Sequence, residues 1–153
     1  MRIALLLSLV ITLAAPAWAG EAANANLDVL RDTIRANRKA LVAVNLRLTD
    51  AEAKDFWPVY DRYEKDLKEV NDRLVQVLDD YSSHFKDLSD EQAKKLLDDY
   101  LAVEEDRAKL RRTYVADFGK TLPGKKVARF YQIENKMDAV IRYDLAATIP
   151  VVE

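Results

Sequence analysis

The chain has 153 residues, with 24 Lys and Arg against 26 Asp and Glu and no cysteine. This charge balance excludes general nucleic-acid binding, which draws its affinity from excess positive charge. The lack of cysteine excludes disulfides, thiolate metal sites, cysteine nucleophiles and a lipid-modified N-terminal cysteine. A chain of this length normally folds as one domain with one hydrophobic core.

Residues 1–19 have the three parts of a secretory signal peptide. Arg2 supplies the positive end, an apolar run follows it, and Ala17 and Ala19 are the small residues of a cleavage point. The run of thirteen apolar residues is shorter than the about 20 residues that a membrane-spanning helix needs. We therefore expect cleavage after Ala19, export to the periplasm, and a single helical domain of residues 20–153.

The first helix that we expect in the mature chain runs from Glu21 to Val44. Its apolar residues recur at helical spacing. They are Leu27, Leu30, Ile34, Leu41 and Val44. Residues 44–48 then alternate apolar and polar side chains, which predicts an extended link.

A second, much longer helix is predicted from Thr49 to about Phe85. Its apolar positions follow one another at steps of four and three, which is typical of a seam packed lengthwise on partner helices. They are Phe56, Tyr60, Tyr63, Leu67, Val70, Leu74, Val77, Tyr81 and Phe85. Pro58 should kink the helix near Lys54. A straight helix of this length would measure about 55 Å, so we expect an elongated or bent helical hairpin or bundle.

The third predicted helix begins after Ser89 and ends at Gly119, where a left-handed turn can close it. Its seam contains one charged residue, Arg107, whose guanidinium we expect to reach solvent. A last helix is predicted from about Lys125 to Ala147. Its inward positions are Val127, Phe130, either Ile133 or Glu134, Met137, Ile141 and Leu145. The chain is therefore predicted to be all-α, with about four helices.

Two short stretches of the chain have similar sequences: LTDAE at 48–52 and LSDEQ at 88–92. In each, a Ser or Thr is followed three residues later by Glu or Gln, which is the pattern of a capping box. Each stretch therefore predicts the start of a helix. The equivalent positions are Leu48, Thr49 and Glu52 in the first stretch and Leu88, Ser89 and Gln92 in the second.

These stretches resemble the LTxxQ motif that occurs twice in the Spy/CpxP family of bacterial periplasmic proteins. The first has Glu for Gln and the second Ser for Thr, and the stretches 56–60 and 125–134 do not match the family, so the chain resembles a divergent member. The resemblance implies an all-helical, often dimeric, cradle-shaped protein. Family members bind unfolded or misfolded clients without ATP, modulate envelope-stress sensing, or in some branches handle metal ions. The six motif positions inherit a mainly structural role.

Residues 119–125 match the first seven positions of a nucleotide-binding loop, but Lys126 stands where Ser or Thr must bind magnesium. We interpret this segment as a turn between helices. The single histidine, His84, cannot supply the Glu-x-x-His pairs of a di-iron bundle. With no catalytic pair either, we expect no cofactor, no metal site and no enzymatic activity.

A client or partner surface is predicted where aromatic residues adjoin basic ones, because slender helices cannot enclose every aromatic side chain. Such a surface could equally be ordinary solvated helix faces. Its predicted residues are Phe56, Trp57, Tyr60, Arg111, Arg112, Lys125, Lys126 and Arg129.

Together these features predict a periplasmic, ATP-independent chaperone or envelope-stress adaptor that binds unfolded or misfolded proteins on an apolar surface rimmed by charge. The alternative is a non-enzymatic structural or regulatory protein with one dedicated envelope protein, or an anionic membrane surface, as its partner. In either case the chain can form a homodimer.

Overall fold

The computed structural model describes residues 37–152. Within them the chain forms a helical segment at 37–46 and three long helices, α2 (Asp50–His84), α3 (Asp90–Thr121) and α4 (Gly124–Thr148), and no strand. The prediction of an all-α fold is thereby confirmed. The predicted signal peptide and the beginning of the first predicted helix lie outside the described residues.

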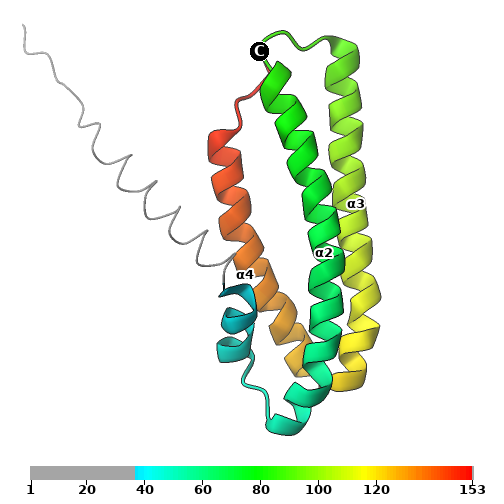
Figure 1. Cartoon of the computed structure of the whole chain (residues 1–153), viewed down its shortest axis with the longest axis vertical. Helices are drawn as coiled ribbons and strands as arrows, with labels where there is room; N and C mark the ends of the chain where they lie inside the picture. Colours follow the sequence, from blue (N-terminus) through cyan, green and yellow to red (C-terminus); the bar gives the residue numbers. More distant parts are fainter. Residues whose placement is uncertain (1–36, 153) are drawn as a thin grey trace, which may run out of the picture.

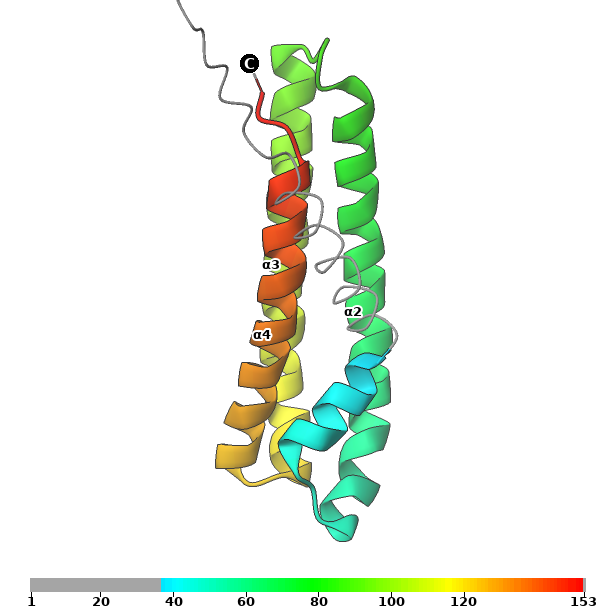
Figure 2. The same cartoon turned by 90° about the vertical axis from the view of Figure 1, so that its left-hand side faces the viewer.

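The three long helices run up, down and up along one long axis. Helices α2 and α3 form an antiparallel hairpin (Figure 1), and α4 returns alongside α3 (Figure 2). Segment 37–46 lies obliquely across the lower parts of α2 and α4 (Figure 2). We call the end that carries the α2–α3 connection, residues 85–89, the hairpin end, and the opposite end the base. The molecule is therefore an elongated bundle, as expected.

Both predicted capping boxes are present. The Thr49 hydroxyl accepts a hydrogen bond from the Glu52 backbone, and the Glu52 carboxylate accepts one of 2.8 Å from the Thr49 backbone. Ser89 and Gln92 repeat the arrangement, with 3.0 Å between the Ser89 nitrogen and the Gln92 side-chain oxygen. Each box satisfies backbone N–H groups that a helix start leaves unpaired. The repeated stretches therefore fix where α2 and α3 begin.

The predicted end of the third helix at Gly119 is wrong. Gly119 does not adopt a positive φ, and α3 continues to Thr121. The helix ends because Leu122 precedes Pro123, and the proline ring disfavours helical backbone in the residue before it. Leu122 accordingly has φ −134° and ψ 150°, and Pro123 is the N-cap of α4.

The predicted extended link at 44–48 is also wrong for most of its length, because the helix continues to Leu46 and only 47–49 are irregular. Val42 and Leu46 are spaced one helical turn apart and are both buried, at 0% and 1% exposure. Val44 lies between them and is 75% exposed. A strand would place all three side chains on one face, whereas a helix turns Val44 away from the buried pair. The reversal into α2 falls on Arg47, whose φ is 53°.

Pro58 lies inside α2, which continues unbroken through it. A proline removes one helical hydrogen bond and crowds the carbonyl four residues earlier, here that of Lys54. Figure 1 shows α2 as a bowed rod. The helix thus accommodates the proline without a break.

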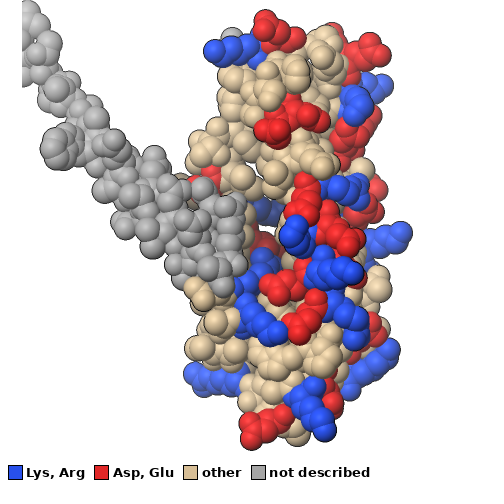
Figure 3. Space-filling model, in the orientation of Figure 1, with Lys and Arg blue, Asp and Glu red and all other residues tan. Residues whose placement is uncertain are grey.

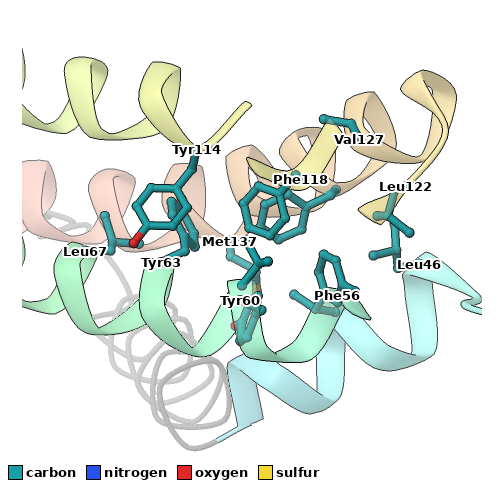
Figure 4. Close-up of a cluster of buried hydrophobic side chains, with 13 residues drawn as sticks. Leu46, Phe56, Tyr60, Tyr63, Leu67, Tyr114, Phe118, Leu122, Val127 and Met137 are labelled. Atoms are coloured by element: carbon teal, nitrogen blue, oxygen red, sulfur yellow. The ribbon is translucent and has the colours of Figure 1, made fainter. Parts of the chain in front are cut away.

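The core is concentrated at the base, where six aromatic rings from α2, α3 and α4 pack together (Figure 4). The two closest rings are Phe118 and Phe130, with centroids 4.5 Å apart. These six residues are Phe56, Tyr60, Tyr63, Tyr114, Phe118 and Phe130. A second, smaller cluster of Val70, Leu74 and Val103 lies further toward the hairpin end. Because aromatic side chains bury the largest areas, most of the packing energy is located at the base.

Candidate functional site

Two residues of the predicted client surface belong to the core. Phe56 and Tyr60 are both 0% exposed, and their rings contact that of Phe130 at 5.5 Å and 6.0 Å. They lie on the seam of α2 one turn apart, and that seam faces both α3 and α4. The prediction that these two side chains lie at an exposed surface is therefore wrong. Trp57, beside them, is half-buried and has the Lys39 ammonium 5.2 Å above its ring.

Two of the basic residues of that surface hold the reversal before α2 in place. The Lys126 ammonium binds the Glu52 carboxylate and donates to the Arg47 carbonyl at 3.2 Å. Arg129 donates through Nε to the Asn45 carbonyl at 2.8 Å. Charge-assisted hydrogen bonds of this kind are stronger than neutral ones. Both cations are thus used to attach the segment before α2 to α4.

Three basic residues remain from the predicted set. Arg111 donates to the Asn135 side chain at 2.6 Å and lies 5.5 Å from the centre of the Tyr131 ring. Arg112 and Lys125 are exposed. The structure therefore does not bring the eight predicted residues together in one exposed surface.

A buried ionic cluster joins three helices in the middle of the bundle. Arg38 donates to Glu134 at 2.5 Å and to Asp138 at 3.1 Å, and the Tyr63 hydroxyl donates to Glu134 at 3.1 Å. Of the two residues that the sequence left open, Glu134 takes the inward position and is 0% exposed. Burial raises the pKa of the Glu134 carboxyl above its ordinary value, and the nearby Arg38 guanidinium opposes this.

Arg107 lies near this cluster, and the prediction that its guanidinium reaches solvent is wrong. Its side chain is buried, at 7% exposure, so the guanidinium does not reach open solvent. Glu104, one turn earlier, lies 3.7 Å from Nε, and burial lowers the pKa of Arg107. The charges of Asp138 and Glu104 oppose this effect of burial and help to retain the cation inside, whereas the nearby Arg142 adds to it.

These buried charges are not arranged as a metal site. Within residues 37–152, no group of three or more His, Asp or Glu side chains is arranged to hold a metal ion. The Glu134 carboxylate already accepts hydrogen bonds from Arg38 and Tyr63. We therefore interpret the cluster as a structural contact that holds segment 37–46, α2 and α4 together.

The best candidate for a binding site is an apolar groove at the hairpin end, with a volume of about 470 Å³. Its walls come from the last turns of α2, the first turns of α3, the end of α4 and the tail that follows α4. The aliphatic and aromatic lining residues on α2, α3 and the connection are Leu74, Val77, Leu78, Tyr81, Leu88, Ala93, Leu96, Leu97 and Tyr100. Leu88 is a motif residue, so the second motif contributes to the groove as well as to a helix start.

The C-terminal tail, Ile149–Val152, forms one wall of this groove. It passes from the end of α4 toward the top of α2 (Figure 1), where the Tyr81 hydroxyl donates to the Pro150 carbonyl at 2.7 Å. Ile149 is extended, with φ −84° and ψ 120°. Val151 and Val152 remain 85% and 51% exposed, so much of the tail's apolar surface stays in contact with water.

The groove continues into exposed apolar surface. Leu97 and Leu101 on α3 are 56% and 49% exposed. Figure 3 shows an uncharged patch at the hairpin end with acidic and basic side chains at its borders, whereas charged side chains are more densely mixed along the middle of the same face. Contiguous apolar surface of this kind usually marks an interaction site.

The stretch of chain that connects the α2 and α3 walls of the groove is acidic. Residues 79–101 contain seven Asp and Glu but three Lys. Among residues 37–152, Arg142 is the one cation that lines the groove, and it is bound by both oxygens of Glu104, at 2.9 Å and 2.7 Å. The basic rim expected from the sequence is therefore not found at this groove.

Sequence reasoning missed this groove because it concentrated on the aromatic residues near Pro58. Two signals were present in the sequence. The apolar seam of α2 continues to Tyr81, beyond the aromatic residues of the base, and the tail has the apolar sequence IPVV at 149–152. An apolar seam that continues past the main core needs a further partner.

Comparison with protein-family models, curated proteins and solved structures finds no match for this chain. None of the helices within residues 37–152 combines the length and the apolar character that a bilayer-spanning helix needs.

Proposed function

We propose that this chain is a periplasmic, ATP-independent chaperone or envelope-stress adaptor, a divergent relative of the Spy/CpxP proteins, which binds non-native polypeptides at its hairpin-end groove. The signal-like residues 1–19 and the two LTxxQ-like stretches support the cellular location and the family. The groove supports the binding role. No enzymatic step is part of the proposal.

The observation that carries this proposal is the apolar groove that α2, α3 and α4 leave open next to exposed leucines. The groove has about 470 Å³ and is open to solvent beside Leu97, which is 56% exposed. Exposed apolar surface of this kind usually marks an interaction site. Burying one exposed leucine side chain contributes about 1.5–3 kcal/mol. A few such contacts hold an apolar stretch of another chain without any directional chemistry, which suits clients of unrelated sequence.

Aggregation of two unrelated, chemically unfolded proteins tests the proposal. Each is diluted with and without the chain of residues 20–153, in the absence of ATP and at low and high salt. We expect both to stay soluble near a stoichiometric ratio, with little loss at high salt because apolar burial is not screened. If neither is protected, the chaperone function is refuted. The groove then belongs to one dedicated partner, which is the alternative function.

A further inference from the structure

The tail shows what kind of chain fits against the groove. It is a short, extended, aliphatic stretch, and the groove contacts both its side chains and its backbone. Ile149 and Pro150 line the groove together with residues of the helices. The Tyr81 hydroxyl meets a backbone carbonyl, that of Pro150, at 2.7 Å. A hydrogen bond to the backbone does not depend on the side chain at that position, so it is available to any extended chain.

The tail is also weakly held. Among the described residues, its hydrogen bonds to the rest of the protein are the one from Tyr81 and the helix-capping bond from the Ile149 nitrogen to the Leu145 carbonyl, at 3.0 Å. Val151 is 85% exposed. Terminal segments with few buried contacts detach at low free-energy cost.

We propose that the groove binds extended apolar segments of client polypeptides in the place of the chain's own tail, Ile149–Val152, so that the tail competes with every client. This inference rests on the proposed function, because it specifies the conformation of the client and how its access is controlled. The acidic excess of residues 79–101 further favours client segments that carry Lys or Arg beside the apolar stretch.

Competition has a measurable consequence. A site that is free for only a fraction of the time shows an affinity reduced by that fraction. If the tail occupies the groove for about nine-tenths of the time, releasing the tail increases the affinity of the groove for a client about tenfold. The tail therefore sets the affinity of the groove without touching the client.

Two tail variants of the 20–153 chain separate release of the tail from a change in charge. Ile149→Asp places a carboxylate in the apolar wall of the groove, which expels the tail. Val151 also lines the groove, but its side chain is 85% exposed, so Val151→Asp adds the same charge to the same tail where it stays in water and the tail stays in place. The probe is a fluorescent peptide with the sequence of residues 148–152 flanked by two lysines at each end, and its binding is followed by fluorescence anisotropy.

We expect the probe to bind Ile149→Asp about tenfold more tightly than it binds either Val151→Asp or the unchanged chain. A probe in which the isoleucine is replaced by aspartate should bind none of them. Equal affinity of the two variants for the first probe, or no binding to either, overturns the inference. Far-UV circular dichroism confirms that both variants keep their helices.

The aggregation assay on the same variants distinguishes this inference from the proposed function. If the probe prefers Ile149→Asp while no form protects unfolded proteins, competition by the tail is supported and the chaperone function is refuted. If all forms protect unfolded proteins equally and the probe shows no preference, the chaperone function is supported and competition by the tail is refuted. When both hold, Ile149→Asp protects at a lower ratio to client than Val151→Asp does.

Discussion

The Glu134 carboxylate in α4 lies 2.5 Å from the guanidinium of Arg38, 96 residues earlier in the chain. The Tyr63 hydroxyl of α2 donates to the same carboxylate oxygen at 3.1 Å, and the other oxygen is buried without a hydrogen bond from the described residues. One buried carboxylate thus joins segment 37–46, α2 and α4. Such a group is costly to bury and costly to leave without its partner.

Removing Arg38 should therefore destabilise the fold strongly. Arg38→Ala leaves the Glu134 charge buried with Tyr63 as its remaining partner, and we expect the free energy of unfolding to fall by about 3 kcal/mol. Urea denaturation measures the change. Lys68→Ala, which breaks an exposed pair with Asp72, is the control and should cost under about 0.5 kcal/mol. Similar losses in the two variants would contradict a structural role for the buried cluster.

Glu134 should also give the fold a distinctive dependence on pH. Its pKa in the folded protein is raised above the ordinary 4.5, mainly by burial. At a pH between the pKa of Glu134 in the unfolded chain and its pKa in the folded protein, the folded state binds the proton more tightly than the unfolded chain does. The contribution of Glu134 to the free energy of unfolding therefore falls as the pH rises through this range. Unfolding of the chain and of Glu134→Gln across this range measures the effect. The stability of the unchanged chain relative to Glu134→Gln should decrease as pH rises, and a constant difference would contradict the raised pKa.

The aromatic cluster should behave as core and not as a client site. Phe118 contacts the rings of Phe56, Tyr63 and Phe130 and is 0% exposed, so Phe118→Ala should cost about 3–5 kcal/mol. Phe85→Ala is the matched control, because Phe85 is half-buried at the hairpin end. Thermal unfolding should show a much smaller change for the control. If Phe118→Ala unfolds at nearly the same temperature as the unchanged chain, the assignment of the core is wrong.

The exposed leucine at the groove should matter for clients and little for stability. Leu97→Asp introduces a charge at a groove residue that is 56% exposed, so we expect client protection to drop several-fold while the unfolding midpoint stays nearly constant. Val115→Asp places the same charge elsewhere on α3, at a residue that is 47% exposed and does not line the groove. Protection should be unchanged in this control. A loss that is equal in both variants would point to net charge, not to the groove, as the cause.

The two capping boxes should contribute independently. Thr49→Ala and Ser89→Ala each remove a side-chain acceptor at a helix start, and we expect each to cost about 1 kcal/mol. Because the two caps share no partner, the double variant should lose about the sum, within about 0.5 kcal/mol. Chemical denaturation of the three variants provides the measurement. A cost near zero at Ser89 would show that α3 starts equally well without its box.

The features that were predictable from sequence are those that local chemistry determines. The capping boxes act over three residues, and the seam of α2 repeats every three or four, so the helix predicted from Thr49 to Phe85 corresponds closely to Asp50–His84. The end of α3 was misplaced because Gly119 is permitted but not required to adopt a left-handed turn. Pro123 restricts its neighbour Leu122 by steric contact, which is the stronger constraint.

The candidate site was harder to predict because it depends on contacts between distant segments. Spacing placed Phe56 and Tyr60 on a seam but did not show that the seam faces two helices at once. Likewise, the alternatives Ile133 and Glu134 could be decided only by the partner, Arg38, which lies about a hundred residues away in sequence. The apolar groove forms where the ends of three helices and the tail come together, and no short sequence motif encodes contacts between such distant segments.

The unequal distribution of aromatic residues along the bundle has a dynamic consequence. With the large rings at the base and the groove at the other end, local opening should begin at the α2–α3 connection and stop where the rings interlock. Backbone amides near residues 78–97 should therefore exchange with solvent much faster than those near residues 56–67 and 114–118. The arms of the hairpin can separate at their tips while their bases stay packed, so the groove can widen for bulky side chains without unfolding of the domain.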